Sequence, residues 1–134
     1  MHRGGLWHRC FHLWVVSGGG VLLQRRAADK EACGGMLDAT AAGHLTAGDA
    51  VAGGAREAEE ELGVAFALDG LASLGMRPVV DHPTQATTNR ELQHVFLARD
   101  DRPVAREELV LASCLRALAI MLERFSRGER PLAI

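Results

Sequence analysis

One segment constrains the fold more than any other: residues 56–64 read R-E-A-E-E-E-L-G-V and hold four glutamates within five positions. This pattern predicts a helix over residues 50–62. Asp49 is the candidate N-cap of this helix, and Gly63, directly after the last apolar position, is the candidate C-cap. Both ends of the helix are therefore marked in the sequence.

Helical spacing brings three carboxylates onto one face. Glu57, Glu60 and Glu61 stand at i, i+3 and i+4, whereas Glu59 points elsewhere. Like charges at this spacing repel by about 0.2–0.5 kcal/mol per pair, and a bound cation would reverse the sign. Carboxylates are hard ligands, and magnesium commonly takes one or two of them together with phosphate oxygens of a substrate. The alternative is a solvated acidic face balanced by Arg56.

Gly53 and Gly54 fall inside the first turns of this helix, where each costs about 1 kcal/mol relative to alanine. Helix propensity therefore does not explain this end of the helix. We expect a close approach to another backbone or to a ligand there.

The other segments predict strands around two helices. Residues 9–16 and 21–25 are rich in strand formers and flank the turn signal S-G-G-G, which predicts a β-hairpin. A phosphate-binding loop is not indicated, because neither a Lys-Ser/Thr pair nor a helix follows. The later elements are a short strand between glycine turns within 33–44, one or two strands within 64–76, a loop at 77–89, a strand at 91–98 and an amphipathic helix within 107–127. This order indicates an α/β or α+β fold.

Composition limits the class of protein. The 134 residues are about one domain, and 48% hydrophobic with 24% charged residues is ordinary globular composition. A net charge of -2 gives no basic field for nucleic acid. No apolar run is long enough for a membrane span and no secretory signal is recognised, so we expect a cytoplasmic protein. Cys10, Cys33 and Cys114 are expected to be reduced thiols, mostly buried.

Taken with Gly43 and Asp49, the glutamate segment resembles the Nudix box, G-x5-E-x7-R-E-U-x-E-E-x-G-U, in which U is aliphatic. Residues 56–64 satisfy the right half position by position, with Ala58 a small choice for U. The left half departs twice, since Asp49 replaces the first glutamate and only six residues separate it from the arginine. A hairpin ending in Q-R-R, a strand leading into A-G-H and a later N-R-E-L extend the resemblance over residues 8–98 at least.

The resemblance implies an α/β fold, a Nudix-type α/β/α sandwich with a mixed β-sheet. It also implies hydrolysis of a diphosphate linkage with Mg2+ or Mn2+, acting on a small substrate of nucleoside diphosphate type or a related one. The implied residues are Glu57, Glu60, Glu61 and the Gly43 carbonyl as metal ligands, Glu60 or Glu57 as general base with Arg56 orienting the cluster, and Arg25, Arg26, Lys30 and Glu91 as substrate or second-site contacts. For the three loop cations, a solvated loop is the alternative.

The hairpin followed by R-R-x-x-x-K and then A-G-H looks like the branch of the family that includes isopentenyl diphosphate isomerase and its hydrolase relatives. The isomerase has a cysteine directly before G-H, whereas this chain has Ala42. The motif places neither Cys10 nor Cys33 where that thiol would be, so isomerase activity is not expected. His8 and His44 match metal-binding histidines of the isomerases, although for His44 we favour a loop role with hydrogen bonds to backbone.

His8, Cys10 and His12 alternate, so a strand would place them on one face, where a zinc site is an alternative. One thiol and two imidazoles need a fourth ligand or water, and the sequence supplies no obvious one. We therefore prefer a half-buried strand with histidines at its rim. Trp7 and Trp14 are candidates either for stacking on a base or for the core or an interface.

Three functions stay open at this point. The near-complete box favours a metal-dependent hydrolase, while the shortened spacing and the double glycine favour a Nudix-fold binding module without catalysis. The isomerase is the third. We expect a single domain over residues 1–134 with a short C-terminal part, in which the apolar stripe of the last helix forms core or a homodimer face.

Overall fold

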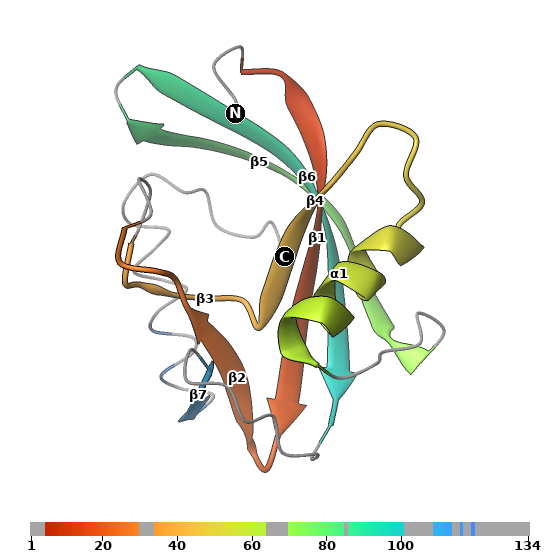
Figure 1. Cartoon of the computed structure of the whole chain (residues 1–134), viewed down its shortest axis with the longest axis vertical. Helices are drawn as coiled ribbons and strands as arrows, with labels where there is room; N and C mark the ends of the chain where they lie inside the picture. Colours follow the sequence, from red (N-terminus) through yellow and green to blue (C-terminus); the bar gives the residue numbers. More distant parts are fainter. Residues whose placement is uncertain are drawn as a thin grey trace.

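The computed structural model describes residues 5–29, 34–63, 70–84, 86–100 and 109–113, together with residues 116 and 119. Its elements are β1 (Trp7–Ser17), β2 (Gly20–Arg25), β3 (Leu37–Asp38), β4 (Ala41–Leu45), α1 (Ala52–Leu62), β5 (Ala72–Thr84), β6 (Thr87–Arg99) and β7 (Leu109–Ser113). The strands form one sheet in the order β3-β2-β1-β6-β5, with β4 paired to β1 and β7 paired to β2 (Figure 1).

β1 organises the sheet, because it pairs along both edges. One edge runs parallel to β6 from Trp7 to Val16. The other edge is shared by two antiparallel partners, β4 beside residues 9–13 and β2 beside residues 15–17. The sheet is therefore mixed, as predicted, and the predicted β-hairpin is confirmed. Its turn contains Gly18 and Gly19, whose φ angles of 55° and 81° favour glycine.

The loop predicted at residues 77–89 is wrong. Most of this segment belongs to the long antiparallel pair of β5 and β6, whose turn lies between Thr84 and Thr87. Pro78 suggested a loop, but β5 is an edge strand, where a missing N–H is tolerated. The predicted strand at 91–98 is confirmed as part of β6.

The prediction of a helix within residues 107–127 is wrong for the first part of that segment. Residues 109–113 form β7, which pairs antiparallel with β2. The periodicity of a short apolar run does not distinguish a strand from a helix. Here residues 109–113 form a strand because they pair with the available edge of β2. Residues 116 and 119 are helical. The other residues predicted for this helix, and residues 64–69 of the strand predicted at 64–76, lie outside the described residues.

The predicted helix is confirmed as α1, but its start differs from the prediction. Val51 occupies the N-cap position, where no side chain makes a capping hydrogen bond. Asp49 instead accepts a hydrogen bond from the Thr46 N–H at 3.0 Å, which closes the turn before the helix. The predicted N-cap role of Asp49 is therefore wrong. At the other end, Gly63 has a φ of 69° and donates its N–H to the Glu59 carbonyl, so the predicted C-cap is confirmed.

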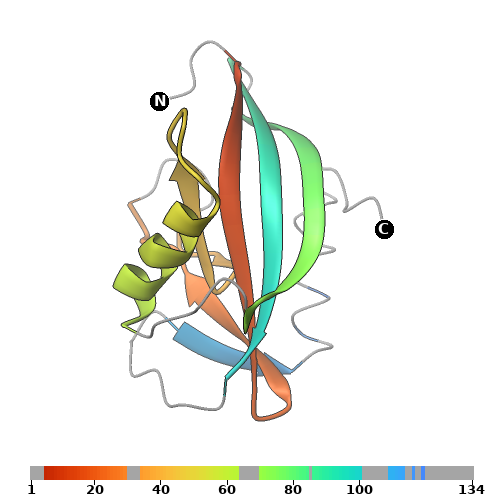
Figure 2. The ribbon, with the colours of Figure 1, turned by 90° about the vertical axis from the view of Figure 1, so that its right-hand side faces the viewer.

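α1 covers one face of the sheet (Figure 2). The core beneath it consists of Phe11, Leu13 and Val15 of β1, with contributions from β4, β6 and the helix itself. A Cβ at Gly54 would collide with the Phe11 ring, so this glycine lets the helix approach β1 closely. The close approach expected from the double glycine is confirmed for Gly54, whereas a Cβ at Gly53 would meet only the end of the Arg56 side chain, at 3.9 Å.

The two faces of the central strands differ in chemistry. Successive side chains of a strand point to opposite faces, so His8, Cys10 and His12 of β1 point away from the core under α1. Their register partners on β6 are Glu91, Gln93 and Val95. The face opposite α1 therefore carries polar and titratable groups where a structural core would be apolar.

Candidate active site

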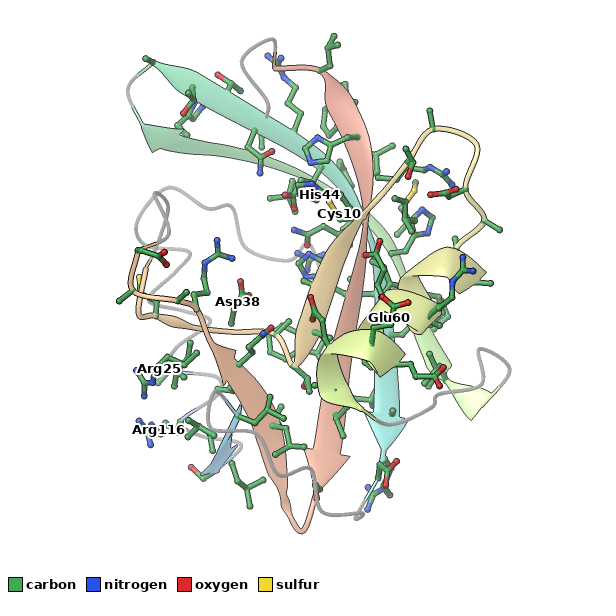
Figure 3. The ribbon with its side chains drawn as sticks, in the orientation of Figure 1. Cys10, Arg25, Asp38, His44, Glu60 and Arg116 are labelled. Carbon is green, nitrogen blue, oxygen red and sulfur yellow. The ribbon has the colours of Figure 1, made fainter. Side chains whose placement is uncertain are left out.

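The three glutamates that share a face of α1 are exposed, and one of them lies against β4. Glu57 makes the closest approach, because a Cβ at Gly43 would collide with its carboxylate. Gly43 therefore leaves room for that carboxylate against the β4 backbone. It does so from within the strand and not from the predicted turn. Figure 3 shows Glu60 on α1, and the Glu60, Glu61 and Arg56 side chains all reach solvent.

A second group of metal-ligating side chains lies on the other face of the sheet. His8, Cys10, His44 and Glu91 each offer one ligand atom, and these atoms all lie within 4.8 Å of one another. Strand register assembles them, since His8 pairs with Glu91 and Cys10 pairs with His44. Figure 3 shows the labelled Cys10 and His44 close together on the paired strands β1 and β4. We call these four residues the ligand group.

Short contacts connect the members of the ligand group. The His8 and His44 rings meet edge to face, with centroids 4.8 Å apart. His8 Nε2 lies 3.7 Å from Glu91 Oε1. The imidazoles of β1 and β4 and the carboxylate of β6 therefore converge on one small volume.

Glu91 is oriented by its neighbours on the same strand face. Asn89 donates its side-chain N–H to Glu91 Oε1 at 2.8 Å, and Gln93 donates to Oε2 at 2.7 Å. Burial acts to raise the pKa of Glu91, but these two hydrogen bonds and the nearby His12 and His8 outweigh it, so the pKa lies below its ordinary value. Glu91 is consequently an ionised ligand at neutral pH.

The pKa shifts of His44 and Cys10 favour their uncharged forms. Burial lowers the pKa of His44, and the charge of His8 lowers it further. Burial and the adjacent Glu91 raise the pKa of the Cys10 thiol. Without a metal, Cys10 is therefore a protonated, buried, free thiol, as predicted for this cysteine. A neutral imidazole is the form that binds a metal, whereas the thiol would lose its proton to one.

The donor atoms suit two kinds of metal. Imidazole, thiolate and carboxylate together favour zinc and related transition metals. The carboxylates of α1 are hard ligands that favour Mg2+ or Mn2+. The two sets flank β4, and the charge of Glu57 contributes to the pKa of His44 across the strand. The described residues thus place side chains of metal-binding type on both faces of β4.

The preferred sequence-based interpretation of the β1 histidines is incomplete. The further candidate ligands come from other strands, as His44 of β4 and Glu91 of β6, while His12 lies outside the group. His44 therefore lies in a strand and not in the loop that we favoured. The polar alternation of Asn89, Glu91 and Gln93 was a signal in the sequence, but only strand pairing shows what it faces.

The basic loop residues make contacts within their own part of the chain. Arg25 donates to the Gly35 carbonyl at 3.0 Å, and Arg26 donates to Asp38 at 3.4 Å. Lys30 lies outside the described residues.

Trp7 is half exposed, whereas Trp14 packs against the small apolar cluster of β2, β3 and β7. Cys33 and Cys114 also lie outside the described residues.

Residues 6–117 match the family model of the NUDIX domain. The chain belongs to the Nudix family. An uncharacterized Nudix hydrolase of Clostridium acetobutylicum is 32% identical over 101 residues, which cover 72% of this chain and 48% of that protein. The uncharacterized Nudix hydrolase YfcD of Salmonella typhi is 34% identical over 146 residues, covering 98% of this chain and 79% of that one. The chain thus spans about half the length of the Clostridium relative.

A MutT protein from Methanosarcina mazei has a similar structure. The TM-score is 0.66 at 19% identity, and the match covers 93% of this chain and 96% of that chain. The predicted Nudix-type fold with a mixed sheet is confirmed by this likeness. No helix in the described part of the chain is long and apolar enough to cross a membrane.

Proposed function

We propose that this Nudix domain is a metal-dependent pyrophosphohydrolase that cleaves a diphosphate linkage in a small substrate of nucleoside diphosphate type or a related one. The observation that carries the proposal is the position of the Glu57 carboxylate, which packs against the backbone of Gly43. Glu57 belongs to residues 56–64, which match the right half of the Nudix box. A solvated acidic face would require no such approach to β4.

Glu57, Glu60, Glu61 and the Gly43 carbonyl are the proposed ligands of Mg2+ or Mn2+. β4 pairs with β1 alone among the described strands, so backbone groups on its other edge are available for ligation. A divalent ion supplies charge neutralisation at phosphate oxygens and lowers the pKa of a bound water. The ligand group on the opposite face is the proposed second ion site, and Glu91 belongs to it.

The protein's own side chains are proposed to position the substrate and to deprotonate the attacking water. We assign the general base to Glu60 or Glu57, exposed carboxylates on the shared face of α1. Arg56, which directly precedes Glu57, is proposed to orient this cluster. Arg25, Arg26 and Lys30 are proposed to attract the anionic substrate, with the hydrogen bonds of Arg25 and Arg26 holding their loop in shape.

Two other functions make different predictions. A Nudix-fold binding module would bind metal and diphosphate without turnover. An isomerase would need an acid at position 42, where Ala42 has no proton to transfer. Cys10 is a protonated thiol on the neighbouring strand, but the motif does not place it at position 42, where the isomerase has its cysteine. We therefore propose hydrolysis over both.

The test is release of phosphate or pyrophosphate across a panel of nucleoside di- and triphosphates, nucleotide sugars, dinucleotides and isoprenoid diphosphates, with Mg2+ or Mn2+. Glu60→Gln is compared with wild type and with Glu59→Gln, which removes an equal charge from a different face of the same helix. We expect Glu60→Gln to lower kcat/KM at least tenfold, about 1.4 kcal/mol in barrier, and Glu59→Gln to change it little.

Two results would count against the hydrolase, and a third would count against the role of Glu60. Folded protein that binds Mn2+ and diphosphates but releases no product under any condition would indicate the binding module. Equal losses in the two glutamine variants would show that net charge, and not the position of Glu60, supports activity. Conversion of an isopentenyl substrate without phosphate release would indicate the isomerase.

A further inference from the structure

Arg77 of β5 is a partly buried cation, and the described residues supply no hydrogen-bond partner to two of its three guanidinium nitrogens. Its Nε and Nη1 atoms are buried and make no hydrogen bond. No ion pair joins Arg77 to a described carboxylate, and the lowered pKa of its guanidinium has burial as its cause. The other arginines of the polar regions differ, since Arg25, Arg26 and Arg9 all donate hydrogen bonds.

An arginine in this condition is costly to the fold. Removing a charge from water is unfavourable unless an opposite charge or a set of acceptors compensates. Structural arginines usually obtain that compensation inside the protein, whereas the described residues provide none at Nε or Nη1 of Arg77. Its position is therefore explained best by an anion that arrives from outside the chain.

Strand register places Arg77 in line with the ligand group. Arg77 pairs with Gln93 of β6, Gln93 pairs with Cys10 of β1, and Cys10 pairs with His44 of β4. Residues in register share a face, so all four side chains lie on the face opposite α1. With strands about 4.8 Å apart, the Cα atoms of Arg77 and Cys10 are about 10 Å apart.

Gln93 is the residue between the cation and the ligand group in this row. Its amide is already committed to Glu91, to which it donates at 2.7 Å. A guanidinium fork fits the paired oxygens of a phosphate, which accept two parallel hydrogen bonds.

We propose that Arg77 is a substrate-binding residue, which holds a phosphate group of the substrate on the sheet face opposite α1, across Gln93 from His8, Cys10, His44 and Glu91. This inference rests on the proposed function for the identity of the anion, a diphosphate. It adds that the substrate extends over β6 towards β5, beyond the box helix, and that its phosphate is recognised by charge and by bidentate geometry.

The binding test needs no turnover. Isothermal titration of inorganic pyrophosphate into metal-free protein in EDTA compares wild type with Arg77→Met, Arg77→Lys and the control Arg99→Met, which removes an exposed arginine near the end of β6. We expect Arg77→Met to weaken binding at least tenfold, Arg77→Lys to retain part of it and Arg99→Met to match wild type. Unchanged affinity in Arg77→Met would overturn the proposal, as would competition by acetate equal to that by inorganic phosphate.

Thermal unfolding separates a substrate role from a structural one. Without ligand, Arg77→Met is expected to have a Tm equal to or above that of wild type, because it removes an uncompensated charge. A Tm several degrees lower would show that Arg77 stabilises the fold, and would overturn the proposal.

The turnover assay separates this inference from the proposed function. Arg77-dependent pyrophosphate binding with no hydrolysis of any substrate would contradict the hydrolase and retain the anion site. Hydrolysis with unchanged kcat and KM in Arg77→Met would support the hydrolase and contradict the anion site. A raised KM with little change in kcat is the expected result.

Discussion

The carboxylate of Glu57 occupies the space that a side chain at residue 43 would fill. This relationship joins α1 to β4 at the point where the two halves of the box meet. It explains why a glycine stands in the middle of a strand, where glycine is otherwise unfavourable. The predictions below begin from this contact.

Gly43→Ala is expected to displace the Glu57 carboxylate and to lower Mn2+ affinity at least tenfold, because the added methyl group and the carboxylate cannot occupy one position. Isothermal titration of Mn2+ measures the change. Gly70→Ala is the control, since a Cβ there would meet nothing within 4 Å. Equal affinities of wild type and Gly43→Ala, in folded proteins, would contradict a metal site at this contact.

The adjacent glycines of α1 are expected to respond in opposite directions to alanine. Gly53→Ala gains helix propensity without a serious contact and should stabilise the protein by about 1 kcal/mol. Gly54→Ala collides with Phe11 in the core and should destabilise it by about 1–3 kcal/mol, the usual cost of overpacking. Urea unfolding of both variants measures the difference. Two changes of the same sign would show that α1 does not pack on Phe11 through Gly54.

Asp49 is expected to stabilise the turn before α1 in a pH-dependent way. Hydrogen bonding to Thr46 lowers the pKa of Asp49 from its ordinary value of 3.8. A carboxyl group with a lowered folded-state pKa contributes stability above the unfolded-state pKa, and this contribution is lost as the pH falls through the folded-state value. Asp49→Ala should therefore lower the Tm at pH 7, and its difference from wild type should shrink as the pH falls from 7 to below 3.8. A difference that is constant over this range would contradict an ionised acceptor.

Thr40 is expected to be a hydrogen-bonding residue of the core. Its buried hydroxyl accepts from the Val15 N–H at 2.8 Å and donates to the Leu22 carbonyl, which connects the loop before β4 to the β1/β2 hairpin. Thr40→Val should cost about 1–3 kcal/mol, because both backbone groups would stay buried without partners. Thr40→Ser keeps the hydroxyl and should lose less. Equal unfolding free energies of the two variants would contradict the bridge.

Local chemistry made part of the site predictable. The carboxylates of Glu57, Glu60 and Glu61 share a helix face because of their spacing alone, and the match to the box followed from adjacent letters. The ligand group was not predictable in this way. His8 and Cys10 were suspected on one strand, but His44 and Glu91 are 36 and 83 residues from His8 in the chain and meet it only through strand pairing.

The sequence by itself determined the hairpin at Gly18 and Gly19, the body of α1 and its end at Gly63, because each depends on backbone preferences of neighbouring residues. Tertiary structure decided the rest. It converted the segment with Pro78 into an edge strand, turned residues 109–113 into a strand on β2, and left Asp49 in a turn. Those outcomes depend on which strand edges and sheet faces are available for pairing and burial. Intrinsic secondary-structure propensities differ by only about a few tenths of a kcal/mol per residue, which does not outweigh strand pairing and burial.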